Sequence, residues 1–254
     1  MASIVDAFSE SISENLSFVK IVLYAIPVYF CTKFFLVGEM GSFYFYAIIS
    51  AILFLGLLTQ GINNVRMNKK EVLTLNPLSL AKSILLASLV MLPQIFIWYF
   101  IGNLIVTMIQ IPIDLPHTQL IFSIIVWSII GSILLTAYLS FAKYHNVMQA
   151  FNYKVILESC VDIFVCLLFF VPQLAIADVL LVGPVAYLFS FFNLPFTHWG
   201  FIFYCSCVFV VNISIIANYL AQSAYEQIKG SNEEYDDNHN KTNLIDDAVE
   251  RMKN

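Results

Sequence analysis

Apolar residues along this chain gather into six long runs, separated by short polar or proline-containing stretches. A bilayer core about 30 Å thick needs about 20 helical residues to cross it, at about 1.5 Å of rise per residue. The runs approach or exceed that length and are bounded by Gly, Pro, Asn or charged residues. The pattern predicts an all-α fold, a bundle of six transmembrane helices, at 21–37, 43–62, 84–109, 119–142, 160–182 and 196–222.

The segments outside these runs carry predictions of their own. Apolar residues recur every three or four positions from Ile4 to Val19, so residues 1–20 are predicted to form an amphipathic helix on the membrane surface rather than a cleaved signal. Residues 183–195 are apolar but too short to cross, and we expect them to lie along the interface. After the transmembrane domain at 21–228, residues 229–254 are predicted to be a cytoplasmic tail, largely disordered by composition, with a short amphipathic helix.

Composition indicates that this chain is dissolved in lipid. Of 254 residues, 60% are hydrophobic and 11% are charged, against about 45–50% and about 25% in soluble proteins. The formal net charge of −5 does not predict a nucleic-acid partner, because acidic residues crowd into the stretch 226–247 while the membrane-proximal loops are basic. The partner that composition predicts is the lipid bilayer, and the predicted location is the cell membrane.

The distribution of Lys and Arg predicts the orientation, because cytoplasmic loops accumulate positive charge. Six crossings place eleven of the twelve Lys and Arg residues on one side and leave Lys33 alone on the other. The long stem of Lys33 allows its ammonium to reach the headgroups. Both termini are therefore predicted to be cytoplasmic.

Each odd-numbered run carries one proline, Pro27, Pro93 or Pro172. This regular placement of proline predicts three tandem helical hairpins. The similarity between the hairpins is explained either by duplication or by a few coincident residues. A proline inside a helix frees the carbonyl four residues earlier, and in lipid that carbonyl needs a partner. We therefore expect the three prolines to face the protein interior.

Three side-chain amides, Gln94, Gln173 and Asn212, lie at comparable depth near the middle of their runs. One interpretation is that they are hydrogen-bonded links between helices. The other is a polar cavity at the membrane midplane, lined by these amides and the freed carbonyls, that passes or binds a small polar solute. At a shared depth, the amides could hydrogen-bond to one another.

Groups that would support catalysis are scattered. Asp162 and Asp178 fall near opposite ends of the fifth run and are interpreted as hydrated carboxylates at the two interfaces. The four histidines lie in different loops on both sides of the membrane, and the five cysteines are odd in number and mostly within the runs. The sequence thus predicts no metal site, no cofactor and no catalytic residues.

Small residues recur on one face of the fourth run and predict that another helix approaches it closely. This packing stripe comprises Ser128, Gly131, Ser132, Thr136 and Ser140. The contact is either within the chain or between copies, so a homo-oligomer or another membrane protein is a candidate partner.

Three segments carry a family resemblance: GINNVRMNKKEVLTLNP at 61–77, QAFNYKVILE at 149–158 and NYLAQSAYEQI at 218–228. Together they resemble an uncharacterised prokaryotic family of polytopic membrane proteins, domain of unknown function family four thousand and thirteen. The expected Leu-Pro with acidic and Trp residues after the first loop is replaced by Leu75-Asn76-Pro77. The resemblance implies a membrane protein of the same kind and no activity.

Two functions are compatible with these patterns. The first is a non-enzymatic integral membrane protein that acts as a scaffold or assembly component. The alternative is a channel or transporter for a small neutral polar solute. A water-accessible cavity around the three amides would favour transport, and a closed apolar core there would favour the scaffold.

Overall fold

The structure of the protein is a computed structural model. It describes the following parts of the chain: Phe8, Ser9, Ser13, residues 16–67, Lys69, residues 72–109, 118–142 and 147–224, and Ile228.

Within these residues the fold is all-helical, and no strand is present in the described part. The long helices are α2 (Ser17–Val37), α3 (Met40–Arg66), α4 (Pro77–Met108), α5 (Thr118–Ala142), α6 (Tyr153–Phe191) and α7 (Trp199–Tyr219). A 3₁₀ turn, η1 (Gln149–Phe151), precedes α6, and a π-helical turn, η2 (Leu220–Ala224), follows α7. Six helices are long and apolar enough to cross a membrane, which confirms the predicted fold class. The orientation of the termini stays a prediction.

The start of α4 shows how capping extends a helix beyond its apolar run. The side-chain oxygen of Asn76 accepts hydrogen bonds from the backbone N–H groups of Leu78 and Ser79, at 3.1 and 3.4 Å. Pro77 occupies the first helical position, where its missing N–H would have no partner in any case. The helix therefore begins well before the predicted position 84.

Helix α6 contradicts the predicted end of the fifth span at residue 182, because most of the segment 183–195 continues the same helix. It runs without interruption from Tyr153 to Phe191, a length of 39 residues, or about 58 Å. Gly183 and Pro184 lie inside it. A proline removes one hydrogen bond and crowds one carbonyl, here that of Leu180. The remaining backbone hydrogen bonds keep the helix continuous through this position.

The three predicted inward-facing prolines behave differently from one another. Pro27 is half-buried, whereas Pro93 and Pro172 are exposed, so the prediction is wrong for those two. A proline ring pushes the preceding turn away from itself, and long helices curve with their convex side outward. The proline ring therefore lies on the convex, outward-facing side of the helix.

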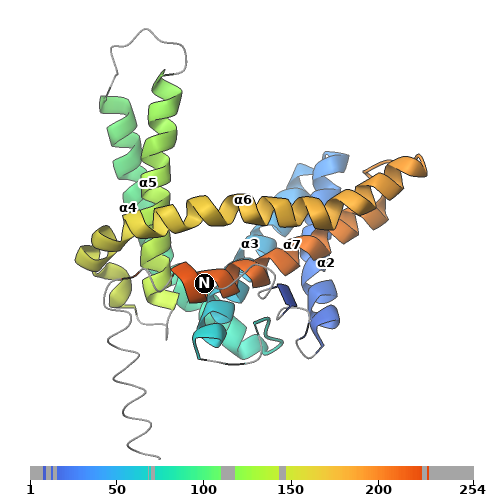
Figure 1. Cartoon of the computed structure of the whole chain (residues 1–254), viewed down its shortest axis with the longest axis horizontal. Coiled ribbons are helices and arrows are strands. Elements are labelled where there is room, and N and C mark those ends of the chain that lie inside the picture. Colours follow the sequence, from blue (N-terminus) through green and yellow to red (C-terminus); the bar gives the residue numbers. More distant parts are fainter. Residues whose placement is uncertain are drawn as a thin grey trace, which may run out of the picture.

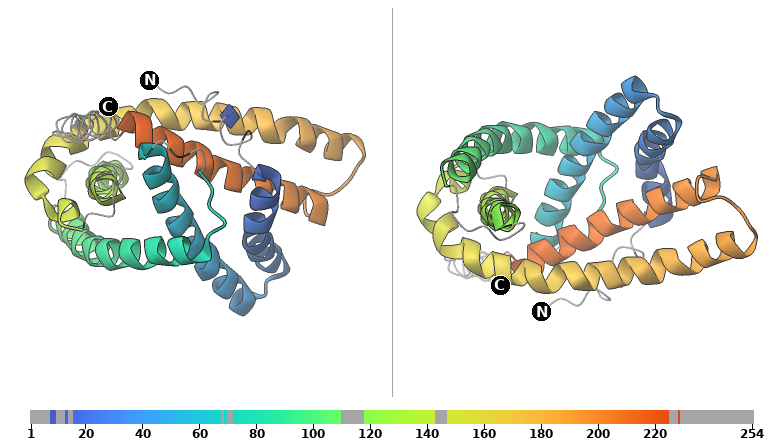
Figure 2. Two further views of the ribbon diagram at one scale, coloured as in Figure 1. Left: turned by 90° about the horizontal axis from the view of Figure 1, so that it is seen from below. Right: turned by 90° about the horizontal axis from the view of Figure 1, so that it is seen from above.

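Every two consecutive long helices are in contact, from α2 and α3 through α6 and α7. Because α3 also packs on α4 and α5 on α6, the division into three tandem hairpins stays a prediction. The pairs do not share one direction: α6 and α7 lie side by side, while α5 runs across them and is seen end-on in the two views of Figure 2 (Figures 1 and 2). The arrangement therefore differs from a bundle of nearly parallel helices.

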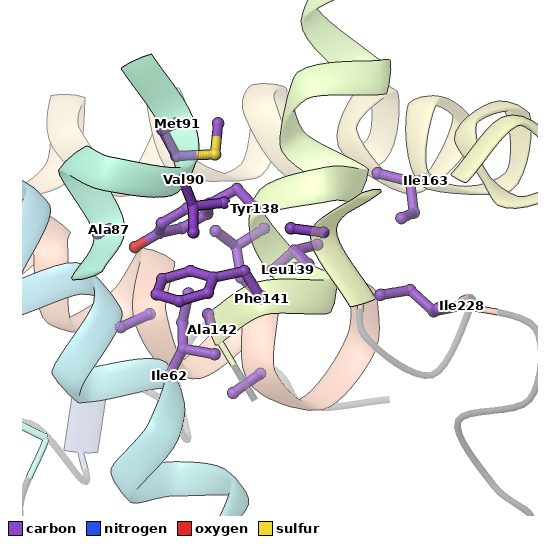
Figure 3. Close-up of a cluster of buried hydrophobic side chains, with 14 of the residues drawn as sticks. Ile62, Ala87, Val90, Met91, Tyr138, Leu139, Phe141, Ala142, Ile163 and Ile228 are labelled. Carbon is purple, nitrogen blue, oxygen red and sulfur yellow. The ribbon is translucent and has the colours of Figure 1, made fainter. Parts of the chain in front are cut away.

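The main apolar core lies where five of the six long helices meet. Ile62 of α3, Val90 of α4, Phe141 of α5, Ile163 of α6 and Ala217 of α7 are all completely buried in one cluster. Figure 3 shows Phe141 and Tyr138 of α5 reaching toward Val90 and Ile62. Helix α2 packs instead into a second cluster, around Tyr24 and Ala25.

Several predicted segments lie wholly or largely outside the described residues. They are the tail 229–254, the loop 110–117 and most of the N-terminal segment 1–20. The last residues of that N-terminal segment, from Ser17 to Lys20, form the first turn of α2. Lys20 is buried there.

Candidate functional site

Gln94 is an internal structural amide. Its side chain is completely buried on α4. The side-chain Nε2 donates a hydrogen bond to the backbone carbonyl of Ala150 in η1, which lies against α5. The contact joins α4 to the segment that leads into α6, and no other predicted amide takes part in it.

Gln173 has the opposite environment. It is exposed on α6, between the exposed residues Val171 and Ile176. Within the described part of the chain its amide makes no hydrogen bond. The predicted gathering of Gln94, Gln173 and Asn212 is therefore wrong, because α6 presents Gln173 outward while Gln94 is held by η1.

Asn212 is paired with a carboxylate. Its Nδ2 donates a hydrogen bond to Oδ1 of Asp178 across the α6–α7 interface, at 2.7 Å. Both side chains are half-buried. The Asn212 Oδ1 atom is buried and has no hydrogen-bond partner among the described residues. A carboxylate and an amide thus share one site between two apolar helices.

The continuity of α6 removes the helix end near Gly183 on which the prediction of an interfacial Asp178 rested. Because the helix extends to Phe191, Asp178 lies near the middle of a stretch, 163–191, that holds no other charged residue. Asn212 lies near the middle of the uncharged stretch 199–224. Helices that cross a bilayer through such stretches carry their midpoints near the middle of the apolar layer. The pair is thus a candidate intramembrane ionisable site.

A hollow formed by other residues of α6 and α7 is mainly apolar, and neither Asp178 nor Asn212 lines it. The hollow, of about 250 Å³, lies between α2, α6 and α7, and its lining includes Phe18, Ile21, Leu181, Tyr204, Val208 and Val211. Leu181 is three residues beyond Asp178, and Val211 precedes Asn212. The Tyr204 hydroxyl on this wall is engaged, since it donates to the Leu181 carbonyl at 2.8 Å. The hollow offers few polar contacts to a neutral polar solute.

A second polar cluster, at the end of α3, was not predicted. Ser83 of α4 donates to Gln60 Oε1 at 2.6 Å, and Gln60 Nε2 donates to Asn64 Oδ1 at 3.1 Å. Nearby in sequence, Thr59 Oγ1 lies 2.6 Å from the Tyr138 hydroxyl of α5. The available signal was the run TQGINN at 59–64, in which every residue except Ile62 is small or polar and all six are buried. These groups bond to one another and join three helices, so they stabilise the fold.

The packing stripe of α5 is divided by the structure. Ser132, Thr136 and Ser140 are buried, whereas Ser128 is only half-buried and Gly131 is exposed. A Cβ atom added at Gly131 would meet nothing within 4 Å. The close approach to α5 instead uses Gly102 of α4, where an added Cβ would lie 2.6 Å from Ile130 Cδ1.

Metal-ligating side chains do not assemble in the described ranges, where no group of three His, Cys, Asp or Glu residues is close enough to hold an ion. Three of the four histidines, His117, His145 and His239, lie outside those ranges. His198 is the N-cap of α7, where its Nδ1 accepts from the Gly200 N–H at 3.2 Å. The five cysteines are free thiols.

Comparisons with family models, curated proteins and solved structures found no match to this chain. The resemblance to domain of unknown function family four thousand and thirteen therefore stays a prediction from the three quoted segments.

Proposed function

We propose that this chain is a non-enzymatic assembly component of a membrane, which binds another membrane-embedded polypeptide through the outer face of α6. The observation that carries the proposal is the exposed amide of Gln173 in the middle of α6. In hydrocarbon an amide without a partner is costly, and polar side chains on membrane helices commonly hydrogen-bond to a neighbouring helix.

The extent to which other helices bury α6 supports the same proposal. Its buried residues are Ile156, Ser159, Cys160, Ile163 and Phe170, all in the first half of the helix. From Val171 onward no residue of α6 is buried. Lipid chains satisfy an apolar surface of this kind, but they provide no partner for the Gln173 amide.

The separation of the three amides argues against a pore at the midplane. A polar path would need Gln94, Gln173 and Asn212 on a common wall, and they lie in three different environments. The hollow between α2, α6 and α7 is lined almost wholly by apolar atoms. Neither feature suits a small neutral polar solute.

Site-specific photo-crosslinking in native membranes tests the assembly proposal. A photoreactive residue at Ile176, which is 61% exposed on α6, should give a discrete covalent adduct. The same residue at Leu120, 58% exposed on α5, is the matched control and should give none. Absence of an adduct at Ile176, or the same adduct at both positions, would contradict the proposal.

A transporter is the second candidate, and the Asp178–Asn212 pair favours it, because deep carboxylates often lie on ion or solute paths. Stopped-flow shrinkage of proteoliposomes in glycerol or urea gradients tests this function. If the chain accelerates solute entry and Asp178→Asn abolishes the acceleration, transport replaces assembly. We expect rates equal to those of protein-free vesicles.

A further inference from the structure

The second half of α6 carries an exposed stripe with the spacing of a helix–helix seam. Its positions follow alternating steps of four and three residues, which is the spacing of the two apolar positions in successive heptads. The stripe, called the α6 seam below, comprises Phe169, Gln173, Ile176, Leu180, Gly183 and Tyr187. The side chains at 169, 176, 180 and 187 are between 61% and 70% exposed. A 3.5-residue repeat is the pattern by which two helices pack along their whole contact.

The α6 seam lies away from the helix's contact with α7. On the α7 side, Phe170 is buried against Ile215, and Leu174 packs beside them. Asp178 faces the same way, since it accepts the hydrogen bond from Asn212. At about 100° per residue, Phe170, Leu174 and Asp178 lie about 100° to 180° around the helix from the centre of the seam. Figure 1 shows the second half of α6 extending beside α7 and beyond the α4–α5 pair.

The α6 seam also has room for a close neighbour. Gly183 is part of it, and a Cβ atom added there would meet nothing within 4 Å. Glycine at a seam position lets a second helix approach closely, which gives two membrane helices their dispersion contacts. Elsewhere on the chain, Gly61 and Gly102 already serve such contacts with other helices.

Gln173 is the polar position of this seam and indicates what covers it. A glutamine amide has two donors and one acceptor oxygen, so it can pair with an identical amide. Copies of one chain enter the membrane in the same orientation. A two-fold axis along the membrane normal then brings Gln173 of each copy to the same depth. A single polar residue in an apolar seam also sets the register of the two helices.

We propose that two copies of this chain associate through their α6 seams, with the paired Gln173 amides hydrogen-bonded across the two-fold axis. This rests on the proposed assembly function and names the partner as a second copy. A different protein would need a polar group of its own at the depth of Gln173. The identical chain supplies one by symmetry.

Energy transfer between donor-labelled and acceptor-labelled full-length chains in lipid vesicles tests the proposal, with the lipid-to-protein ratio varied to obtain an association constant. We expect the wild-type chain to associate and Gln173→Leu to weaken association about three- to thirtyfold. Gln173→Asn should retain most of it, because it keeps the amide. Ile124→Ala, at a 57% exposed position on α5, should change nothing. The thermal stability of each variant in detergent confirms that it is folded.

The outcomes separate this inference from the assembly function beneath it. The proposed dimer through the α6 seam is contradicted if the wild-type chain stays monomeric at every lipid-to-protein ratio. It is also contradicted if wild type and Gln173→Leu associate equally. If the Ile176 crosslink then gives an adduct that is not twice the mass of one chain, assembly stands with a different partner. If no adduct forms either, both proposals fail.

Discussion

The dipeptide Pro-Gln occurs in the middle of two membrane helices and has opposite surroundings in each. In α4, Gln94 follows Pro93 and is completely buried, with its amide donating to the Ala150 carbonyl. In α6, Gln173 follows Pro172 and is exposed, with no hydrogen bond in the described part of the chain. Both prolines face outward. The difference comes from what lies beside each helix: η1 provides a partner for Gln94, and nothing described does so for Gln173.

This contrast shows that the position of a polar residue within an apolar run does not indicate whether the residue stabilises its own chain or is available to a partner. Gln94 and the cluster around Gln60 are bonded within the fold, so they stabilise the chain itself. Gln173 gains little within one chain, and its amide is available to another polypeptide. Substitutions in the covered part should therefore lower stability. Matched substitutions on the open surfaces should leave it unchanged.

The largest effect is expected where a glycine touches a neighbouring helix. An added Cβ at Gly61 would lie 2.9 Å from Ala217 Cβ and 3.3 Å from the Val72 carbonyl oxygen, neither of which moves easily. Gly61→Val should cost about 1–3 kcal/mol by overpacking. Gly131→Val, with nothing within 4 Å, is the control and should stay within about 0.5 kcal/mol. Thermal unfolding in detergent measures both, and equal losses would contradict the covered-versus-open distinction.

The six membrane helices could be predicted because the thickness of the apolar layer sets a minimum length for each run. Their ends could not be predicted as well, because local hydrogen bonds set them. The Asn76 cap moves the start of α4 to Pro77. In α6, Gly183 and Pro184 have the composition of a helix end but lie inside the helix, so the predicted end of the fifth span at residue 182 is wrong.

The candidate site could be predicted only in part. The sequence indicates that Gln94, Gln173 and Asn212 are deep in their helices. It does not indicate which side of each helix is covered, because that depends on segments far away in the chain. Asn212 pairs with a residue 34 positions earlier, and Gln94 with one 56 positions later. The directions of the hairpins are set in the same way, by contacts among helices rather than by local pattern.

The two glutamines provide the direct test of the comparison. Methionine has nearly the shape of glutamine but cannot form its hydrogen bonds. Gln94→Met should lower the free energy of unfolding by about 1–2 kcal/mol, because it leaves the buried Ala150 carbonyl without this donor. Gln173→Met should leave the stability of the single chain unchanged or raise it slightly. Both are measured by denaturation of the monomer in detergent, and a larger loss for Gln173→Met would reverse our assignment of their roles.

The smallest effect is expected at a tyrosine hydroxyl. The Tyr138 hydroxyl lies 2.6 Å from Thr59 Oγ1 inside the core, and Thr59 also donates to the Leu55 carbonyl at 2.7 Å. Because Thr59 keeps that second bond, Tyr138→Phe should cost only about 0.5–1.5 kcal/mol. Tyr44→Phe, at a position that is 61% exposed, should have no measurable effect in the same unfolding assay. A Tyr138→Phe variant as stable as the wild type would contradict this prediction. It would mean that the buried polar side chains near α3 stabilise the fold by packing rather than by hydrogen bonding.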